Sequence, residues 1–409
     1  MADAPLGQAA RDHGGRVIAA LAARFRDLDL AEEAFADACL KAAEVWPRDG
    51  APRDPAAWLY AVARRRVLDR LRRRAARERL VPDPPEPAPS VEDLLADAGS
   101  IPDERLALIF VCCHPAVAPD TRAALTLRLV CGLSTAEIAR AFLLPEPTLA
   151  QRLTRAKHKI AEAGVAFEVP GPDAWAERLD AVLSTLEVAY AKAHEDAAGA
   201  GPHAGFAREM LDLTAVLVDL LPTEPECLAL AALVRYAEAR RPARLDESGA
   251  MTPLSEQDPR LWKRPLIEEG ERLLLRAASL GRPGPRQLQA AVHAAWCERE
   301  SLAAPPPWPA VLALYDALLL WRDDAVARIN RAVALAEVRG PAAAMAELDR
   351  LDPAALASFG PWHAVRADLL ARLDRPLEAL EAYDRALALD PAPAERRWLE
   401  ERRARAARD

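Results

Sequence analysis

Apolar residues recur at steps of three and four along most of this chain, which is the spacing of one face of an α-helix. The pattern begins with Val17, Leu21 and Phe25 and predicts helices over residues 27–46 and 56–80. Alanine, leucine and arginine dominate the composition, and aromatic residues make up only 5% of it. Because alanine and leucine favour helices and long β-branched runs are absent, we expect an all-α protein.

Residues 134–159 are the most informative stretch, because they predict two short helices joined by a tight turn. Ser134 and Glu137 have the spacing of a capping box at the start of the first helix. Pro145 ends that helix, and Pro147 suits the first turn of the next one. The second helix should bury four apolar residues on one face: Leu149, Leu153, Ala156 and Ile160. This is the plan of a helix-turn-helix.

The opposite face of that second helix carries cations and hydrogen-bonding side chains without an acid: Thr148, Gln151, Arg152, Arg155, Lys157 and Lys159. Arginine and glutamine suit guanine and adenine edges in the major groove, so this face is a candidate reader of duplex DNA. A helical hairpin whose polar side is only solvated is the alternative, and these residues alone leave it open.

The predicted helix over residues 56–80 is the most basic segment of the chain. Its residues 64–79 include nine arginines against two acids, Asp69 and Glu78. Such an excess of cations repels itself unless a polyanion such as a phosphate backbone neutralises it. Trp58 and Tyr60 add aromatic rings of the kind on which single-stranded bases stack, although a core position would explain them as well.

Length and charge narrow the class of protein. The 409 residues are enough for two or three domains with real cores. The net charge of −8 excludes a chain that is basic throughout, so a nucleic-acid surface must be local. The sequence has no apolar run of membrane-spanning length and no apolar signal-peptide core, so we expect a cytoplasmic protein. Its six cysteines form no CxxC pair and should stay reduced.

No pattern in the sequence predicts catalysis, a metal site or a cofactor. Cys112, Cys113 and His114 lack further donors at usable spacing, and we interpret them as a core-facing segment. The other histidines are scattered, outside Gly-rich phosphate loops and nucleophile elbows. An enzyme with its site in the C-terminal half is therefore the weakest hypothesis.

The order of a basic, aromatic-led helix, a Pro-rich linker and a helix-turn-helix resembles a bacterial sigma factor of the extracytoplasmic-function type, in the sigma-70 family. The resemblance covers residues 16–165, and its most specific motifs are AWLYAVARRRVLDRLRR and GLSTAEIARAFLLPEPTLAQRLTRA. It implies two small helical modules, which are sigma region 2 over residues 16–80 and sigma region 4 over residues 101–165. A linker over residues 81–100 joins them, and residues 1–15 are expected to be disordered.

The resemblance also implies roles for particular residues. Three acids would bind core RNA polymerase: Glu32, Glu33 and Asp37. Four residues would meet the opened strand of the −10 promoter element: Trp58, Arg64, Arg66 and Arg73. Five would meet the −35 duplex: Thr148, Gln151, Arg152, Arg155 and Lys159. The chain departs from residues common in the family at four positions: Ala36, Cys39, Arg65 and Leu143.

Residues 171–409 form a long helical extension that resembles the one in a particular group of these sigma factors. Near its end, positions 34 residues apart correspond, as in a tetratricopeptide repeat (TPR). The second copy has its small, aromatic and proline residues at the expected places: Ala367, Ala379, Tyr383, Ala386 and Pro391. We expect a TPR-like solenoid that binds a protein partner or modulates the sigma modules.

The sequence therefore predicts a non-enzymatic sigma factor that directs core RNA polymerase to promoter DNA. The alternative is a stand-alone helix-turn-helix regulator with a protein-interaction repeat domain. The Arg-rich helix and the lack of a coiled-coil dimerisation segment favour the sigma factor. A requirement for core polymerase distinguishes the two.

Overall fold

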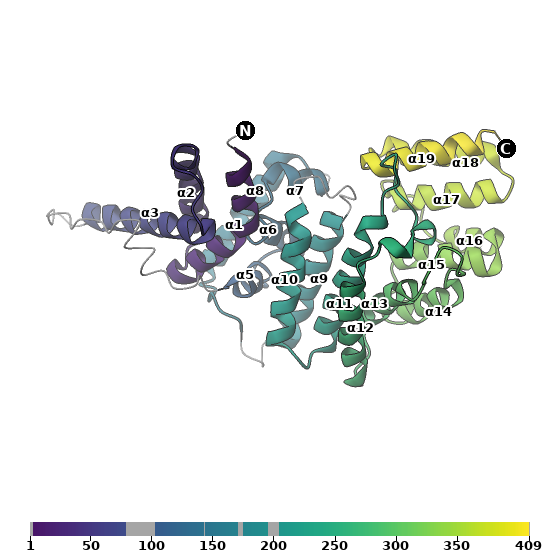
Figure 1. Ribbon diagram of the computed structural model, residues 1–409, viewed down its shortest axis with the longest axis horizontal. Coiled ribbons are helices and arrows are strands. Elements are labelled where there is room, and N and C mark those ends of the chain that lie inside the picture. The colour runs from purple at the N-terminus through teal and green to yellow at the C-terminus, as the bar shows by residue number, and fades with distance from the viewer. Residues whose placement is uncertain (1–2, 79–102, 143, 171–174, 195–203, 409) are drawn as a thin grey trace. The chain divides into compact units, whose positions relative to one another are not determined.

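The computed structural model describes residues 3–78, 103–142, 144–170, 175–194 and 204–408 (Figure 1). Within these residues every regular element is a helix, and the one β pairing is an isolated bridge between Leu245 and Met251. The prediction of an all-α protein is therefore confirmed. The chain forms two compact units, Met1–Lys192 and Ala193–Asp409. None of the described helices is long and apolar enough to cross a bilayer.

The first unit holds two groups of helices. The first group contains α1 (Asp3–Phe25), α2 (Leu28–Asp49) and α3 (Pro55–Glu78), which pack pairwise against one another. The second contains α5 (Arg105–Cys112), α6 (Pro119–Leu129), α7 (Thr135–Ala141) and α8 (Glu146–Glu162). α1 also packs against α5 and α6, so the two groups share an interface. The unit ends with α9 (Trp175–His194).

The N-terminal helix corrects the expectation of disorder over residues 1–15 for its described part, residues 3–15. α1 already begins at Asp3, and the side chain of Ala9 is buried. Gly15 faces the end of α6 so closely that an added Cβ would overlap the carbonyl oxygen of Val130. Close packing therefore requires the missing side chain at residue 15.

α2 shows why its sequence forms a helix. The Asp27 carboxylate accepts a hydrogen bond from the Leu30 N–H at 2.9 Å and caps the N-terminus. The helix runs through Pro47 to Asp49, three residues beyond the predicted end, and Gly50 closes it with φ of 84°. Its buried face consists mostly of alanine, with a residue every three or four positions: Leu28, Ala31, Ala34, Ala38, Ala42 and Trp46.

α9 lies at the start of the expected extension but belongs to the first unit. Arg178 donates a hydrogen bond to the Phe110 carbonyl at 2.6 Å, and its guanidinium lies 5.7 Å from the Phe110 ring centroid. The Cys113 thiol donates to the Thr185 hydroxyl at 3.3 Å. Cys112 and Cys113 are buried, as expected for a core-facing segment, and burial raises the pKa of both thiols. The compact second unit therefore begins about twenty residues later than the extension expected at residue 171.

The second unit is a succession of helices in which neighbours along the chain pack together. Its first α-helices are α10 (Ala204–Leu220), α11 (Pro225–Arg240), α12 (Arg264–Ser279), α13 (Pro285–Cys297) and α14 (Trp308–Leu319). They are followed by α15 (Ala325–Arg339), α16 (Pro341–Leu348), α17 (Gly360–Arg372), α18 (Pro376–Ala388) and α19 (Pro393–Ala406). Three short 3-10 helices lie between α11 and α12: Arg241–Ala243, Leu254–Glu256 and Pro259–Leu261.

The repeat expected near the end of the chain corresponds to the helix pairs α15–α16 and α17–α18. Gly340 and Asp374, 34 positions apart by their numbers, both have positive φ between their two helices, 88° and 63°. The small and aromatic repeat positions of α17 and α18 are buried: Ala367, Ala379, Tyr383 and Ala386. The 34-residue spacing in the sequence thus corresponds to two successive pairs of helices in the structure. The assignment of these pairs to the TPR-like class stays a prediction.

The loop between α11 and α12 is tied to the last helix of the same unit. The Met251 N–H donates to the Ala394 carbonyl at 3.0 Å, and Arg397 donates to the Ser248 carbonyl at 2.6 Å. Arg402 pairs with Glu256 at 2.7 Å. These contacts join segments about 145 residues apart, so the loop is part of the packed unit rather than a free connector.

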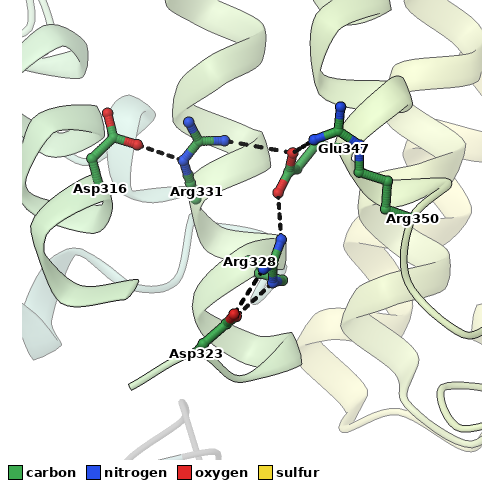
Figure 2. Close-up of polar contacts among 6 residues, drawn as sticks. All are labelled: Asp316, Asp323, Arg328, Arg331, Glu347 and Arg350. Atoms are coloured by element: carbon green, nitrogen blue, oxygen red, sulfur yellow. Dashed lines mark hydrogen bonds and ion pairs between the residues drawn. The ribbon is translucent and has the colours of Figure 1, made fainter. Parts of the chain in front are cut away.

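Glu347 on α16 anchors a charge network across three successive helices (Figure 2). Its carboxylate accepts from Arg328 of α15 at 2.9 Å and from Arg350 at 3.2 Å, and Arg331 lies at 3.8 Å. Arg331 also pairs with Asp316 of α14 at 2.6 Å. The Glu347 side chain is only 9% exposed, so water screens its ion pairs less than those of the surface.

We expect Glu347→Gln to lower the local free energy of unfolding of α15 and α16 by about 2 kcal/mol, because partly buried guanidinium groups lose their counter-charge. Hydrogen exchange followed by mass spectrometry measures this quantity helix by helix. The matched control is Glu378→Gln, whose pair with Arg375 is exposed to water and should therefore change the stability much less. Equal effects of the two substitutions would contradict a special role for Glu347.

Candidate nucleic-acid interface

The helix-turn-helix is present as predicted, and its capping box is confirmed. The Ser134 N–H donates to the Glu137 carboxylate at 2.7 Å, and the Glu137 N–H donates to the Ser134 hydroxyl at 3.2 Å. α8 begins after Pro145 and has Pro147 in its first turn. The four predicted core residues of α8 are all buried: Leu149, Leu153, Ala156 and Ile160.

The outward face of α8 presents most of the predicted DNA-reading side chains. Gln151, Arg155 and Lys159 are exposed, and Thr148 and Arg152 are half-buried. Lys157 departs from the expected pattern, because its side chain is only 16% exposed and forms ion pairs with Asp29 and Glu32 of α2. The sequence places Lys157 among the outward cations, but the structure directs it toward the first group of helices.

A cavity of about 690 Å³ lies between α2, α3 and the loop that joins them. Trp46 and Trp58 meet in its wall with ring centroids 5.5 Å apart and an interplanar angle of 67°. The indole Nε1 of Trp46 is buried and has no hydrogen-bond partner among the described residues. The remaining lining combines cations, acids and small residues: Lys41, Val45, Asp49, Gly50, Ala51, Pro52, Val62, Arg65, Arg66 and Asp69. A flat, polar-edged ligand suits such walls.

The arginines of α3 differ in their surroundings: some line the cavity or face solvent, and others are half-buried or ion-paired. Arg66 lines the cavity, and Arg73, seven positions further on and therefore on the same helical face, is exposed. Arg64 is half-buried, and its Nε has no partner in the described part of the chain. Arg70 pairs with Glu33 and, at 3.1 Å, with Asp37, so it stabilises the packing of α2 on α3.

The predicted polymerase-binding acids all lie on α2 and all have partners within the chain. Glu33 and Asp37 share Arg70. Glu32 is 15% exposed and accepts from Lys157 at 2.9 Å, and Arg128 of α6 lies 3.1 Å from it. This helix therefore presents a compact row of carboxylates whose charge is matched by cations from other helices.

Comparison with known proteins agrees with this geometry. The model of sigma-70 region 2 matches residues 9–77, and the model of sigma-70 region 4 matches residues 107–160. The chain is a sigma-70 family sigma factor with a C-terminal extension. A family of unknown function, DUF6596, matches residues 178–278 of that extension. The sigma factor is also 40% identical over 390 residues to an uncharacterized protein of Rhizobium meliloti (strain 1021). The alignment covers 94% of this chain and 92% of the relative. No solved structure matches the chain.

The two sigma regions account for the two helix groups of the first unit. Region 2 corresponds to α1–α3 and region 4 to α5–α8. A sigma factor recognises promoters and starts transcription, so this chain binds core RNA polymerase and promoter DNA. The family model of region 2 begins at residue 9, which agrees with the helical rather than disordered N-terminus.

Sequence reasoning missed several residues of the cavity in this sigma factor. Arg65 lines the cavity, whereas the sequence places it only in the basic cluster and among the departures from the family, not among the strand-binding residues. Lys41 and Trp46 of α2 also line it, whereas the resemblance implies only a polymerase-binding role for that helix. The available signal was the Trp46–Trp58 pair at the two ends of a loop rich in proline, glycine and aspartate. That loop brings the two rings together.

Proposed function

We propose that this sigma factor is of the extracytoplasmic-function type and reads its promoters through two surfaces of the first unit. The outward face of α8 meets the −35 duplex through Thr148, Gln151, Arg152, Arg155 and Lys159. The basic face of α3 and the adjoining cavity capture the opened −10 strand through Trp58, Arg64, Arg66 and Arg73. The single observation that supports this division best is the aromatic cavity beside the most basic helix.

The chemistry of the cavity suits an unstacked base. Its volume of about 690 Å³ leaves room for a nucleotide base and adjoining sugar. Trp58 offers a ring for stacking, and Trp46 supports that ring edge to face at a centroid distance of 5.5 Å. Arg65 and Arg66 at the same cavity supply charge for the flanking phosphates. A base released from its duplex partner exposes the edges and faces that such a cavity can bind.

Core polymerase would bind α2 through Glu32, Glu33 and Asp37. We propose that the second unit, whose helix pairs form a TPR-like extension, modulates this activity or binds a protein partner. The support is its placement on the same chain and the repeated helix pairs with buried small residues. A stand-alone regulator would use only the helix-turn-helix and would leave the aromatic cavity without a role.

Run-off transcription with core polymerase tests the proposal directly. Adding the full chain to core polymerase and a promoter library should give discrete new start sites that share upstream elements. DNA binding by the chain without any core-dependent transcript would favour the stand-alone regulator instead.

Trp58→Ala should weaken binding of a single-stranded −10 oligonucleotide by the complex with core polymerase by about 1–3 kcal/mol, because one base loses its stacking partner. Fluorescence anisotropy of a labelled oligonucleotide measures the affinity. The control is Trp321→Ala, which removes a surface tryptophan of the second unit that is 56% exposed. A similar loss in both variants would indicate a general effect on the fold rather than stacking.

Substitutions on α8 and α3 should differ in whether the loss of DNA affinity depends on the DNA sequence. Gln151→Ala or Arg152→Ala should cost roughly 1–3 kcal/mol on particular −35 sequences, because each removes a contact to a base edge. Arg73→Ala should reduce affinity on all sequences and flatten its dependence on salt. Binding assays over a set of −35 duplexes and salt concentrations separate these outcomes. Equal losses on every duplex would reassign Gln151 and Arg152 to phosphate contacts.

Because α9 packs on region 4, a truncation that tests the second unit should keep α9. A chain cut within residues 195–203 keeps the Arg178 and Thr185 contacts of α9, whereas a cut at residue 171 removes them. We expect the longer fragment to alter promoter output relative to the full chain, as measured by run-off transcription. We expect the shorter fragment to lose region 4 stability as well, which melting curves report. Unchanged output from the longer fragment at every promoter would contradict modulation by the second unit.

A further inference from the structure

Region 4 lies against α2, the helix of region 2 that is proposed above to bind polymerase. The Lys157 ammonium contacts both Asp29 and Glu32, and its Nζ lies 2.9 Å from a Glu32 carboxylate oxygen. Burial alone would lower the pKa of Lys157, but the hydrogen bonds to Asp29 and Glu32 outweigh it and the pKa is raised. Lys157 is therefore charged at neutral pH, and its pair with Glu32 is largely shielded from water.

A second cation of region 4 approaches the same acid. The Arg128 Nε lies 3.1 Å from the other Glu32 oxygen, so the carboxylate is held between α6 and α8. Glu32 thus has both oxygens engaged by cations of region 4, and it is the least exposed of the three proposed polymerase-binding acids.

Backbone packing supports the same interface independently of charge. Gly15 on α1 lies so close to the end of α6 that a Cβ there would overlap the Val130 carbonyl oxygen. Such a contact cannot form with any other residue at position 15 unless one helix moves. The two regions therefore meet through a steric fit as well as through the ion pairs, at separate points along α6 and α8.

We propose that region 4 is an internal competitor for core polymerase, in which Lys157 and Arg128 occupy the α2 acids until a cationic surface of polymerase displaces them. This inference rests on the proposed role of Glu32. It identifies the kind of surface that fits α2, namely one presenting basic side chains about as far apart as Lys157 and Arg128. Binding of core polymerase would then release both cations and separate region 4 from region 2.

Zero-length crosslinking with a carbodiimide detects the contact of Lys157 with Glu32 and Asp29 in the full chain. It joins a carboxylate to an amine only when the two touch, so mass spectrometry should find Lys157 linked to Glu32 or Asp29. The internal control is the Lys41–Glu44 pair at 2.9 Å within α2, which is independent of region 4. Adding core polymerase should reduce the Lys157 products several-fold. Undiminished Lys157 products in the polymerase complex would overturn the proposal.

Gly15→Ala tests the contact without removing a charge. The variant should lose the Lys157 crosslink and keep the Lys41–Glu44 crosslink. A competitor that occupies the acids about nine-tenths of the time weakens apparent affinity about tenfold, so Gly15→Ala should bind core polymerase up to about tenfold more tightly. Lys157→Ala should change core affinity in the same direction by removing the competing cation.

The outcomes separate this proposal from the proposed function. Active run-off transcription together with unchanged core affinity in both variants would overturn the competition and leave the sigma assignment intact. Absence of core-dependent transcripts would instead count against the proposed function, whatever the crosslinks show. Tighter core binding by Gly15→Ala with loss of its Lys157 crosslink is the result that supports the competition.

Discussion

Close packing of alanine-rich helix faces is the interaction on which both units depend. α2 buries Ala31, Ala34, Ala38 and Ala42 along one face, and α18 buries Ala379, Ala382 and Ala386. A methyl group contributes little burial by itself, so each helix needs an unbroken row of small residues and a neighbour that fits it. Small residues let helix backbones approach closely, and Gly15 against Val130 is the extreme case.

This close packing explains why many charged side chains pair between helices. Where helices lie close together, long cations from one reach the acids of another. Arg70 joins α3 to α2, and Lys157 joins α8 to α2. The Glu347 network does the same for α14, α15 and α16. Many of the charges thus lie in local pairs, while the outward face of α8 and the end of α3 keep exposed cations.

Features set by neighbouring residues could be predicted from the sequence. The Ser134–Glu137 capping box and the buried stripe of α8 follow from spacing within one helix, and both were confirmed. Features set by distant contacts could not be predicted. The partner of Lys157 is more than 120 positions away, and the close approach of Gly15 to Val130 joins residues 115 positions apart by their numbers. The Trp46–Trp58 cavity likewise exists only because α2 and α3 pack side by side.

The position of α9 limits which truncations and substitutions the chain can accept during evolution. Because α9 covers Phe110 and Cys113, region 4 has part of its core supplied by the sequence that follows it. Loss of everything after region 4 would uncover that core, whereas loss of the second unit alone would not. Changes at Phe110, Cys113, Arg178 and Thr185 should therefore be inherited together. The first helix of the extension is therefore a structural part of region 4, and only the residues after α9 can be lost without exposing that core.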